Sequence, residues 1–142
     1  MDYQYPVTLE YGDNEVIATF KDIPEAITFG GDKEHALHDA EDALLVALSA
    51  YVDDKRAIPA ASKASKQQPI IAVPPLATAK IALHNALLSA GLSKAVLAQQ
   101  MGLRETQIRR MLDLDHQSHI GQIEHALRLL GYEVVTSVNK VA

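Results

Sequence analysis

The 142-residue sequence contains no cysteine and no tryptophan, and its aromatic content is 5%. The absence of cysteine excludes disulfides and thiolate metal sites. No apolar run approaches the roughly 20 residues of a membrane-spanning helix, and the first residues, MDYQY, lack the basic-then-apolar pattern of a secretory signal. The chain is 48% hydrophobic and 22% charged, which is typical of a folded globular protein. We therefore expect a cytoplasmic protein that has no contact with a membrane.

Charge is distributed unevenly along the chain. Residues 1–60 contain 13 acidic and 4 basic residues, a net charge of −9, whereas residues 61–142 contain 5 acidic and 9 basic residues, a net charge of +4. Such asymmetry predicts two surfaces with different partners. The alternative is that both surfaces are merely solvated, because charge alone is an argument about solubility and association.

The first half of the chain has the pattern of a small α+β unit. β-Branched and aromatic residues predict strands at 5–11 and 16–20, which the turn-forming residues 12–14 join into a hairpin. A third short strand is expected at 27–29. Asp32 is placed to cap a helix that ends near residues 52–54, and its apolar stripe is spaced by three or four residues. The members of that stripe are Leu37, Ala40, Leu44, Leu48 and Tyr51.

A loop or linker is expected at residues 55–69, which are rich in Ala, Ser, Lys, Gln and Pro. The apolar run 70–73 predicts a strand that returns to the first sheet, and Pro74–Pro75 stops it. Four helices then follow: one ending at Gly91, one starting at Ser93, one at 104–112 and one at 120–130. A final strand at 133–138 is expected to pair at a sheet edge, for which a second copy of the chain is one source.

Residues 92–111 carry the strongest functional signal. Gly102 supplies a tight turn between two helices, and Ala98 lets those helices approach closely. Apolar residues expected to lock them together are Leu97, Leu103, Ile108 and Met111. Between these lie side chains suited to reading base edges or phosphates in a major groove. They are Arg104, Glu105, Thr106, Gln107, Arg109 and Arg110.

The pattern Leu-Ser-x-x-x-Leu-Ala-x-x-x-Gly-x-x-x-x-x-Ile, starting at Leu92, resembles the Xre/Cro class of helix-turn-helix domains over residues 78–131. The resemblance implies that the helix starting at Arg104 or Glu105 is the recognition helix and that Lys94 lies beside the DNA backbone. The sequence departs from the class at Val96, where Glu is common, and at Arg104, where Ser or Thr usually caps the helix. Loss of that cap costs about 1 kcal/mol. The alternative is a helical bundle that has lost DNA binding.

The N-terminal half resembles the HicB antitoxin family. The most specific part is Asp-Ile-Pro-Glu-Ala-x-Thr-x-Gly, from Asp22 to Gly30, together with the acidic helix after it. Val73–Pro74 and Ala79–Lys80 extend the likeness toward the helical half. The resemblance implies a partial RNase H-like domain without nuclease activity that masks HicA, a small basic toxin that cleaves mRNA. It also implies that the helix-turn-helix represses the operon's own promoter.

These observations predict an α+β chain with two domains. Residues 1–74 form a β-β-β-α-β toxin-binding domain that includes the linker, and residues 75–142 form a helix-turn-helix domain with a short C-terminal strand. We expect a homodimer or higher homo-oligomer that binds operator DNA and needs no cofactor or metal. An acidic surface suits a basic toxin, and the residues hypothesised to present it are Asp22, Glu25, Glu41 and Asp42. For Asp22 and Glu25, shaping the turn around Pro24 is an equal alternative.

Two other classes of function stay open at this point. A nuclease would hold Mg²⁺ on convergent carboxylates, for which Asp13, Asp22 and Asp39 are candidates, although their spacing does not demonstrate convergence. The histidine pairs His35/His38 and His116/His119 have three-residue spacing that permits two metal ligands, without an identifiable third. The second class is a ligand-responsive repressor whose N-terminal domain binds a small molecule.

Overall fold

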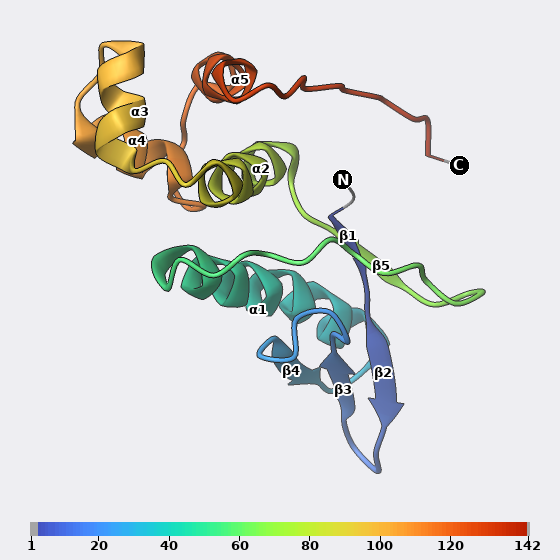
Figure 1. The fold of residues 1–142 in the computed structure, drawn as a ribbon. Coiled ribbons are helices and arrows are strands. Elements are labelled where there is room, and N and C mark those ends of the chain that lie inside the picture. The colour runs from blue at the N-terminus through green and yellow to red at the C-terminus, as the bar shows by residue number, and fades with distance from the viewer. Residues whose placement is uncertain (1–2, 142) are drawn as a thin grey trace.

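A sheet-and-helix unit comes first along the chain and a group of four helices follows it, as the computed structural model shows for residues 3–141 (Figure 1). The first unit comprises β1 (Gln4–Pro6), β2 (Thr8–Tyr11), β3 (Val16–Thr19), β4 (Ile27–Gly30), α1 (Lys33–Asp53) and β5 (Ile70–Ala72). The helical group comprises α2 (Pro75–Ala90), α3 (Lys94–Met101), α4 (Glu105–Leu112) and α5 (Ile120–Leu129). The α+β class is confirmed. The partial RNase H-like description stays a prediction.

The first predicted strand is two strands in two different sheets. β1 pairs antiparallel with β5, with Tyr5 opposite Ile71, whereas β2 pairs with β3. Between them the backbone N–H of buried Val7 donates to the carbonyl oxygen of Pro69 at 2.9 Å. The 70–73 run therefore returns beside β1 and not beside the three-stranded sheet, which corrects the prediction. The apolar alternation of residues 5–11 does not change at Val7, and the local signal for the break is Pro6, which has no N–H to donate to a strand ladder.

The three-stranded sheet has the order β2-β3-β4, all antiparallel, and the predicted hairpin is confirmed. Val16 and Ala18 of β3 point toward α1 and are buried. The end of β4 lies so close to the first turn of α1 that a Cβ on Gly30 would stand 2.5 Å from the backbone nitrogen of Ala36. Any residue larger than glycine would push the sheet away from the helix at this point.

The predicted Asp32 cap is confirmed. Its Oδ1 accepts the backbone N–H of His35 at 2.8 Å and also lies 2.7 Å from the His35 ring nitrogen Nδ1. Four of the five predicted stripe residues are buried and Leu37 is only partly buried, whereas Ala36 and Ala47 are buried although the predicted stripe did not include them. The buried positions of α1 are Ala36, Ala40, Leu44, Ala47, Leu48 and Tyr51.

The Asp32–His35 contact predicts a pH dependence. Hydrogen bonding to Asp32 raises the pKa of His35 above 6.5, and the His35 amide and ring lower the pKa of Asp32. Because the pKa of His35 is raised by folding, its contribution to stability is complete below pH 6.5 and is lost as pH rises through the folded-state value. We expect an NMR titration to give a His35 midpoint above 6.5.

Asp32→Asn should move the His35 midpoint back toward 6.5, because asparagine keeps the cap but removes the charge. Asp39→Asn is the matched control, since Asp39 contributes less to the shift. An unchanged midpoint in Asp32→Asn would contradict the assignment.

Residues 55–69 form no helix or strand, as predicted, yet they are fixed at several points. Ile58 is 3% exposed. Its backbone N–H donates to Asn85 Oδ1 at 2.9 Å, and Asn85 Nδ2 donates to the Ile58 carbonyl oxygen at 2.8 Å. The Tyr5 hydroxyl donates to the carbonyl oxygen of Pro59 at 2.6 Å. The linker is therefore fastened both to the first strand and to α2.

Helix α2 contributes to both hydrophobic cores. Ala77 and Ile81 are buried with the sheet and α1, whereas Ala79 and Leu83 are buried with α3, α4 and α5. The two clusters therefore meet along one helix. The proposed domain boundary between residues 74 and 75 stays a prediction, and the helix that follows it packs into both units.

The predicted C-terminal strand is wrong for the single chain. Residues 133–138 are in no strand, and Val135 and Val138 are 80% and 92% exposed. Figure 1 shows this end of the chain running away from α5. A strand needs a neighbouring strand for its hydrogen bonds, and none of the described residues supplies one here.

Across residues 3–141 no single helix has the length and apolarity to cross a membrane; α2 and α3 pass that test only as a pair, bent by 107°.

Candidate functional site

Helices α3 and α4 form the predicted two-helix unit. Ser93 caps α3, its Oγ accepting the backbone N–H of Val96 at 3.2 Å, and α3 ends at Gly102 with φ of +67°. Only glycine adopts this conformation at little cost. The residues predicted to lock the helices together are buried, with Leu103 partly so. Those buried are Leu97, Ala98, Ile108 and Met111.

The start of α4 lacks the usual capping side chain, as the sequence indicated, and has a substitute. Arg104 occupies the cap position, and its guanidinium has no acceptor atom. Instead its backbone N–H donates to Gln107 Oε1 at 2.8 Å, which is one half of a capping box. Gln107 therefore fixes the beginning of the helix with its amide oxygen, and its amide nitrogen stays available for contact with a base.

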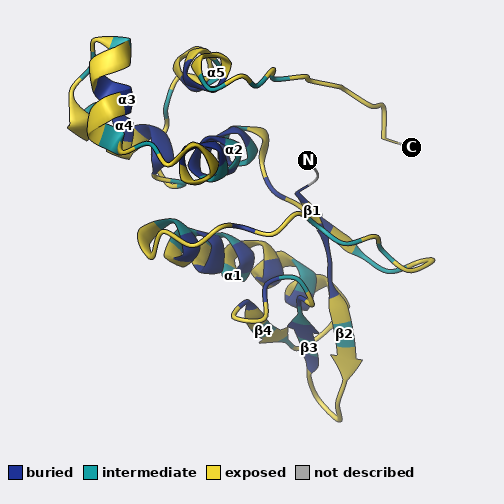
Figure 2. Ribbon diagram, viewed as in Figure 1, coloured by how far each residue is buried: buried dark blue, intermediate teal, exposed yellow. Residues whose placement is uncertain are grey.

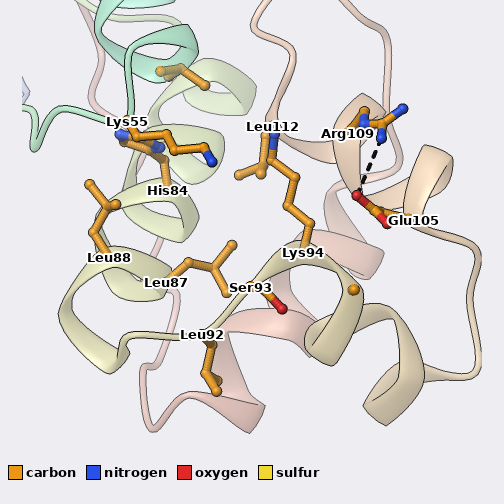
Figure 3. A pocket seen from close by; sticks show the side chains of 12 residues that line it. Lys55, His84, Leu87, Leu88, Leu92, Ser93, Lys94, Glu105, Arg109 and Leu112 are labelled. Atoms are coloured by element: carbon orange, nitrogen blue, oxygen red, sulfur yellow. Dashed lines mark hydrogen bonds and ion pairs between the residues drawn. The ribbon is translucent and has the colours of Figure 1, made fainter.

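The outward face of α4 is polar and mostly cationic. Arg109 and Glu105 form an ion pair at 3.2 Å, one turn apart, with side chains 60% and 47% exposed. Lys94 at the start of α3 is half-buried nearby, and the close view shows all three side chains around one groove (Figure 3). The remaining predicted contact residues on this face are exposed. They are Arg104, Thr106 and Arg110.

At the opposite end of the chain, two of the four predicted acidic contacts are committed to structural bonds. Asp22 Oδ2 accepts both the backbone N–H and the hydroxyl of Ser62, at 3.0 and 2.9 Å. Glu25 accepts the Tyr51 hydroxyl at 2.9 Å and the Arg56 guanidinium at 3.0 Å. That guanidinium also stacks 3.9 Å from the centre of the Tyr51 ring. Asp22 and Glu25 thus hold the linker and the end of α1.

The other two acidic residues, Glu41 and Asp42, lie exposed near the middle of α1. Neither carboxylate has a hydrogen bond or ion pair with any of residues 3–141. Their charges are free to meet a partner.

Comparison with known proteins decides the family. A model described as HicB_like antitoxin of bacterial toxin-antitoxin system matches residues 4–82. The chain is 36% identical to Antitoxin HicB of Pseudomonas fluorescens over 137 residues, which covers 96% of this chain and 94% of that relative. The chain belongs to the HicB-like antitoxin family.

Other family members agree over nearly the full length. Antitoxin HicB 2 of Photorhabdus laumondii is 39% identical over 90% of the chain and 91% of its own length. Antitoxin HicB of Escherichia coli K12 is 34% identical over 92% of the chain and 96% of its own length. The resemblance to the HicB family is therefore confirmed. Membership supports an antitoxin role within a toxin–antitoxin pair, which implies a toxin partner.

One residue of this HicB-family chain that holds the end of α4 was not predicted. Lys80 of α2 is fully buried, and its Nζ donates to the carbonyl oxygens of Arg110, Asp113 and His116 at 2.9, 2.6 and 2.8 Å. It also donates to Ser118 Oγ at 2.9 Å. A cation suits these C-terminal carbonyls, which carry the negative end of the helix dipole. The sequence signal was a single lysine in an otherwise apolar stretch of helix.

Burial and the nearby carboxylate act in opposite directions on Lys80. Removal from water lowers the pKa of the Lys80 ammonium, and the Asp113 carboxylate raises it. The four oxygen acceptors surrounding Nζ compensate for lost hydration of the charged form. The ammonium thereby ties the loop after α4 to α2.

A groove of about 380 Å³ separates the end of α1 from the helix-turn-helix (Figure 3). Leucines from α2, the following turn and α4 form its apolar wall, and Lys55, Lys94 and Arg109 stand at its rim. A second groove of about 320 Å³ adjoins it, where Asp53 and Asp115 face the same two cations, Lys94 and Arg109. The alternative of a small-molecule sensor placed its ligand in the N-terminal domain, whereas these grooves lie against α3 and α4.

The described residues do not assemble the metal-binding site that the nuclease and metal alternatives require. Residues 3–141 contain no group of three or more His, Asp or Glu side chains placed to hold a metal ion. Asp22 is bonded to Ser62, and His116 Nδ1 contacts Ser118 Oγ at 3.0 Å.

Proposed function

We propose that this HicB-family antitoxin neutralises a HicA-type, mRNA-cleaving toxin through its N-terminal unit and represses its own operon by binding operator DNA with α4. The observation that carries the DNA-binding part is the exposed face of α4. That face presents Arg109, Arg110 and Thr106 from a helix whose opposite side is locked into a packed core. Family membership supports the antitoxin part.

Each side chain on α4 has a role that its chemistry supports. Arginine donates to guanine or to phosphate, glutamine bonds adenine, and threonine contacts the thymine methyl group. Lys94, at the N-terminus of α3, is placed to contact the phosphate backbone, which positions the protein without reading sequence. Arg104 at the start of α4 adds a second phosphate contact. The Glu105 carboxylate accepts a hydrogen bond from the cytosine amino group once Arg109 has left its ion pair with Glu105 to bind the DNA.

A dimer would bring two copies of α4 to one palindromic site. Half-sites one helical turn apart lie about 34–36 Å from each other. The unpaired residues 133–138 have free backbone groups and exposed valines, so they are suited to pair with the same segment of a second copy.

The toxin-binding part rests on charge. A net charge of −9 over residues 1–60 favours a basic partner, because complementary potentials raise association rates and disfavour wrong partners. Of the four acidic residues, Glu41 and Asp42 have free carboxylates, so these two strengthen the attraction for a basic partner. Asp22 and Glu25 contribute by shaping the surface.

This electrostatic contribution predicts a strong salt dependence. We expect the affinity for purified HicA-type toxin to fall at least about tenfold between roughly 50 and 500 mM salt, because exposed charges are screened over this range. Titration calorimetry at several salt concentrations measures the slope. Glu41→Gln/Asp42→Asn should reduce the slope while leaving the fold intact. Affinity that does not change with salt would refute an electrostatic interface.

The experiment that tests the whole function is a gel shift with the DNA upstream of the chain's own gene, with and without the toxin. We expect a specific complex with that DNA and a further change in mobility when the toxin is added. A ligand-responsive repressor would bind the DNA but would not bind the toxin. Absence of any specific complex would end the repressor proposal.

A further inference from the structure

The outer face of the three-stranded sheet has no covering layer. Helix α1 covers the inner face, where Val16 and Ala18 are buried. The strand register places two rows of side chains on the other face: Glu10, Ile17 and Phe29 in one row, and Thr8, Thr19 and Ile27 in the next. We call these six residues the sheet face. Figure 2 shows the exposed colour over much of β2.

Two apolar side chains on β4, at one edge of the sheet face, are unusually exposed. Phe29 is 66% exposed and Ile27 is 61% exposed, two residues apart on β4, and Ile17 lies beside Phe29 on β3. Scattered exposed apolar residues need no explanation, but a contiguous group with an aromatic member marks an interaction site.

The edge position of β4 strengthens this conclusion. Within residues 3–141, β4 pairs only with β3. Its four residues, Ile27 to Gly30, include no charge and no proline. Proteins usually protect such an edge with charges, proline or a covering element, because an exposed apolar edge invites association. The sheet face therefore fits a surface that is covered in the assembled complex.

We propose that the sheet face is the docking surface for the toxin, a small basic protein, with Phe29 and Ile27 as its apolar centre. This inference rests on the proposed function and specifies where the partner binds. Acidic residues lie at one end of the apolar centre: Glu10 on the sheet face itself, and Asp13 and Glu15 in the β2–β3 turn. An apolar centre beside charge opposite to the partner's is the arrangement of a specific protein interface.

Charge also decides between the toxin and a second copy of this chain. Two copies meeting at the sheet face would bring together two segments of net charge −9, which repel each other. A basic partner is instead attracted by the negative charge of this segment. Self-association has a separate candidate in the unpaired segment 133–138.

The test uses the full chain and purified HicA-type toxin in a calorimetric titration. Ile27→Thr/Phe29→Thr keeps β-branched residues in the strand and removes the apolar centre. We expect it to weaken toxin binding at least about 100-fold, because aromatic anchors carry most of the energy of such interfaces. Ile120→Thr is the matched control: Ile120 is 47% exposed at the start of α5, in the helical half of the chain. We expect that variant to bind within about twofold of the original chain.

Folding of each variant is checked by its Tm and by its operator binding, which should be unchanged. If Ile27→Thr/Phe29→Thr does not fold, Glu10→Lys is the second variant. It reverses the exposed charge in the cross-strand row that also contains Phe29, and we expect it to lower toxin affinity about tenfold.

Three outcomes overturn the docking surface alone. They are original affinity in the sheet-face variants, an equal loss in Ile120→Thr, and a lower oligomeric mass with unchanged toxin affinity, which would assign the face to a second copy. If the unaltered chain does not bind the toxin, both the docking surface and the proposed neutralisation fail. The two failures are therefore distinguishable.

Discussion

Replacing Lys80 with methionine is expected to destabilise the chain by about 1–3 kcal/mol. Methionine fills a similar volume, so the loss comes from the four oxygens that Lys80 Nζ satisfies at 2.6–2.9 Å. Of the three backbone carbonyls among them, that of Arg110 also accepts the Asp113 N–H and the Ser118 hydroxyl, and that of Asp113 also accepts the His116 N–H. The His116 carbonyl is therefore the one left without a donor once the ammonium is gone. Each buried acceptor left without a donor costs about 1–3 kcal/mol.

Urea denaturation of Lys80→Met, followed by circular dichroism, measures this loss. Lys94→Met is the matched control, because Lys94 is a half-buried lysine on the next helix with no buried acceptors around it. We expect that control to change stability by less than about 0.5 kcal/mol. A loss below about 1 kcal/mol in Lys80→Met would show that water or a shift of the loop replaces the ammonium.

Arg109→Ala and Arg110→Ala should each weaken operator binding about 10- to 100-fold, which corresponds to about 1–3 kcal/mol for a base or phosphate contact. Both side chains are exposed on the outer face of α4, so neither change removes a buried contact. Arg109 lines a groove shared with the end of α1, but its ion pair is with Glu105 of its own helix, and neither arginine belongs to the sheet of the N-terminal unit. We therefore expect toxin affinity to stay within about twofold of the original value. Gel shifts with operator DNA, paired with toxin titrations, measure both.

The chain offers a close control in Arg128→Ala. Arg128 of α5 forms an ion pair with Glu124 one turn earlier, at 2.8 Å, just as Arg109 pairs with Glu105. The substitution Arg128→Ala removes the same charge and the same kind of helical ion pair as Arg109→Ala, but on α5 and not on α4. Equal loss of operator binding in Arg128→Ala would show that net charge, and not the face of α4, determines the affinity. Loss of neutralisation in either α4 variant would refute the division of labour between the two halves.

Local patterns predicted the helices well. The periodicity of α1, the Asp32 and Ser93 caps and the glycines that end α2 and α3 are short-range signals, and each is confirmed. The exposed face of α4 was predictable for the same reason, since positions three and four apart on a helix share one face.

Interactions between distant segments were not predictable in this way. The break at Val7 depends on Pro69, and the commitment of Asp22 and Glu25 depends on Ser62, Tyr51 and Arg56. Lys80 acts on residues 30–38 positions further along the chain. The C-terminal strand was wrong because its β-propensity is local, whereas a strand forms only beside a partner. The exposed sheet face became visible only once the register was known.

Helix α2 has a consequence for any attempt to divide the molecule. A fragment that starts at Pro75 would carry Ala77 and Ile81 into water, and a fragment that stops at Pro74 would leave a hollow where those side chains had packed. Asn85 would also lose both backbone groups of Ile58 that it now holds. The acidic and basic halves of the chain therefore share helix α2 in their hydrophobic cores, and separating them at residue 74 would destabilise both.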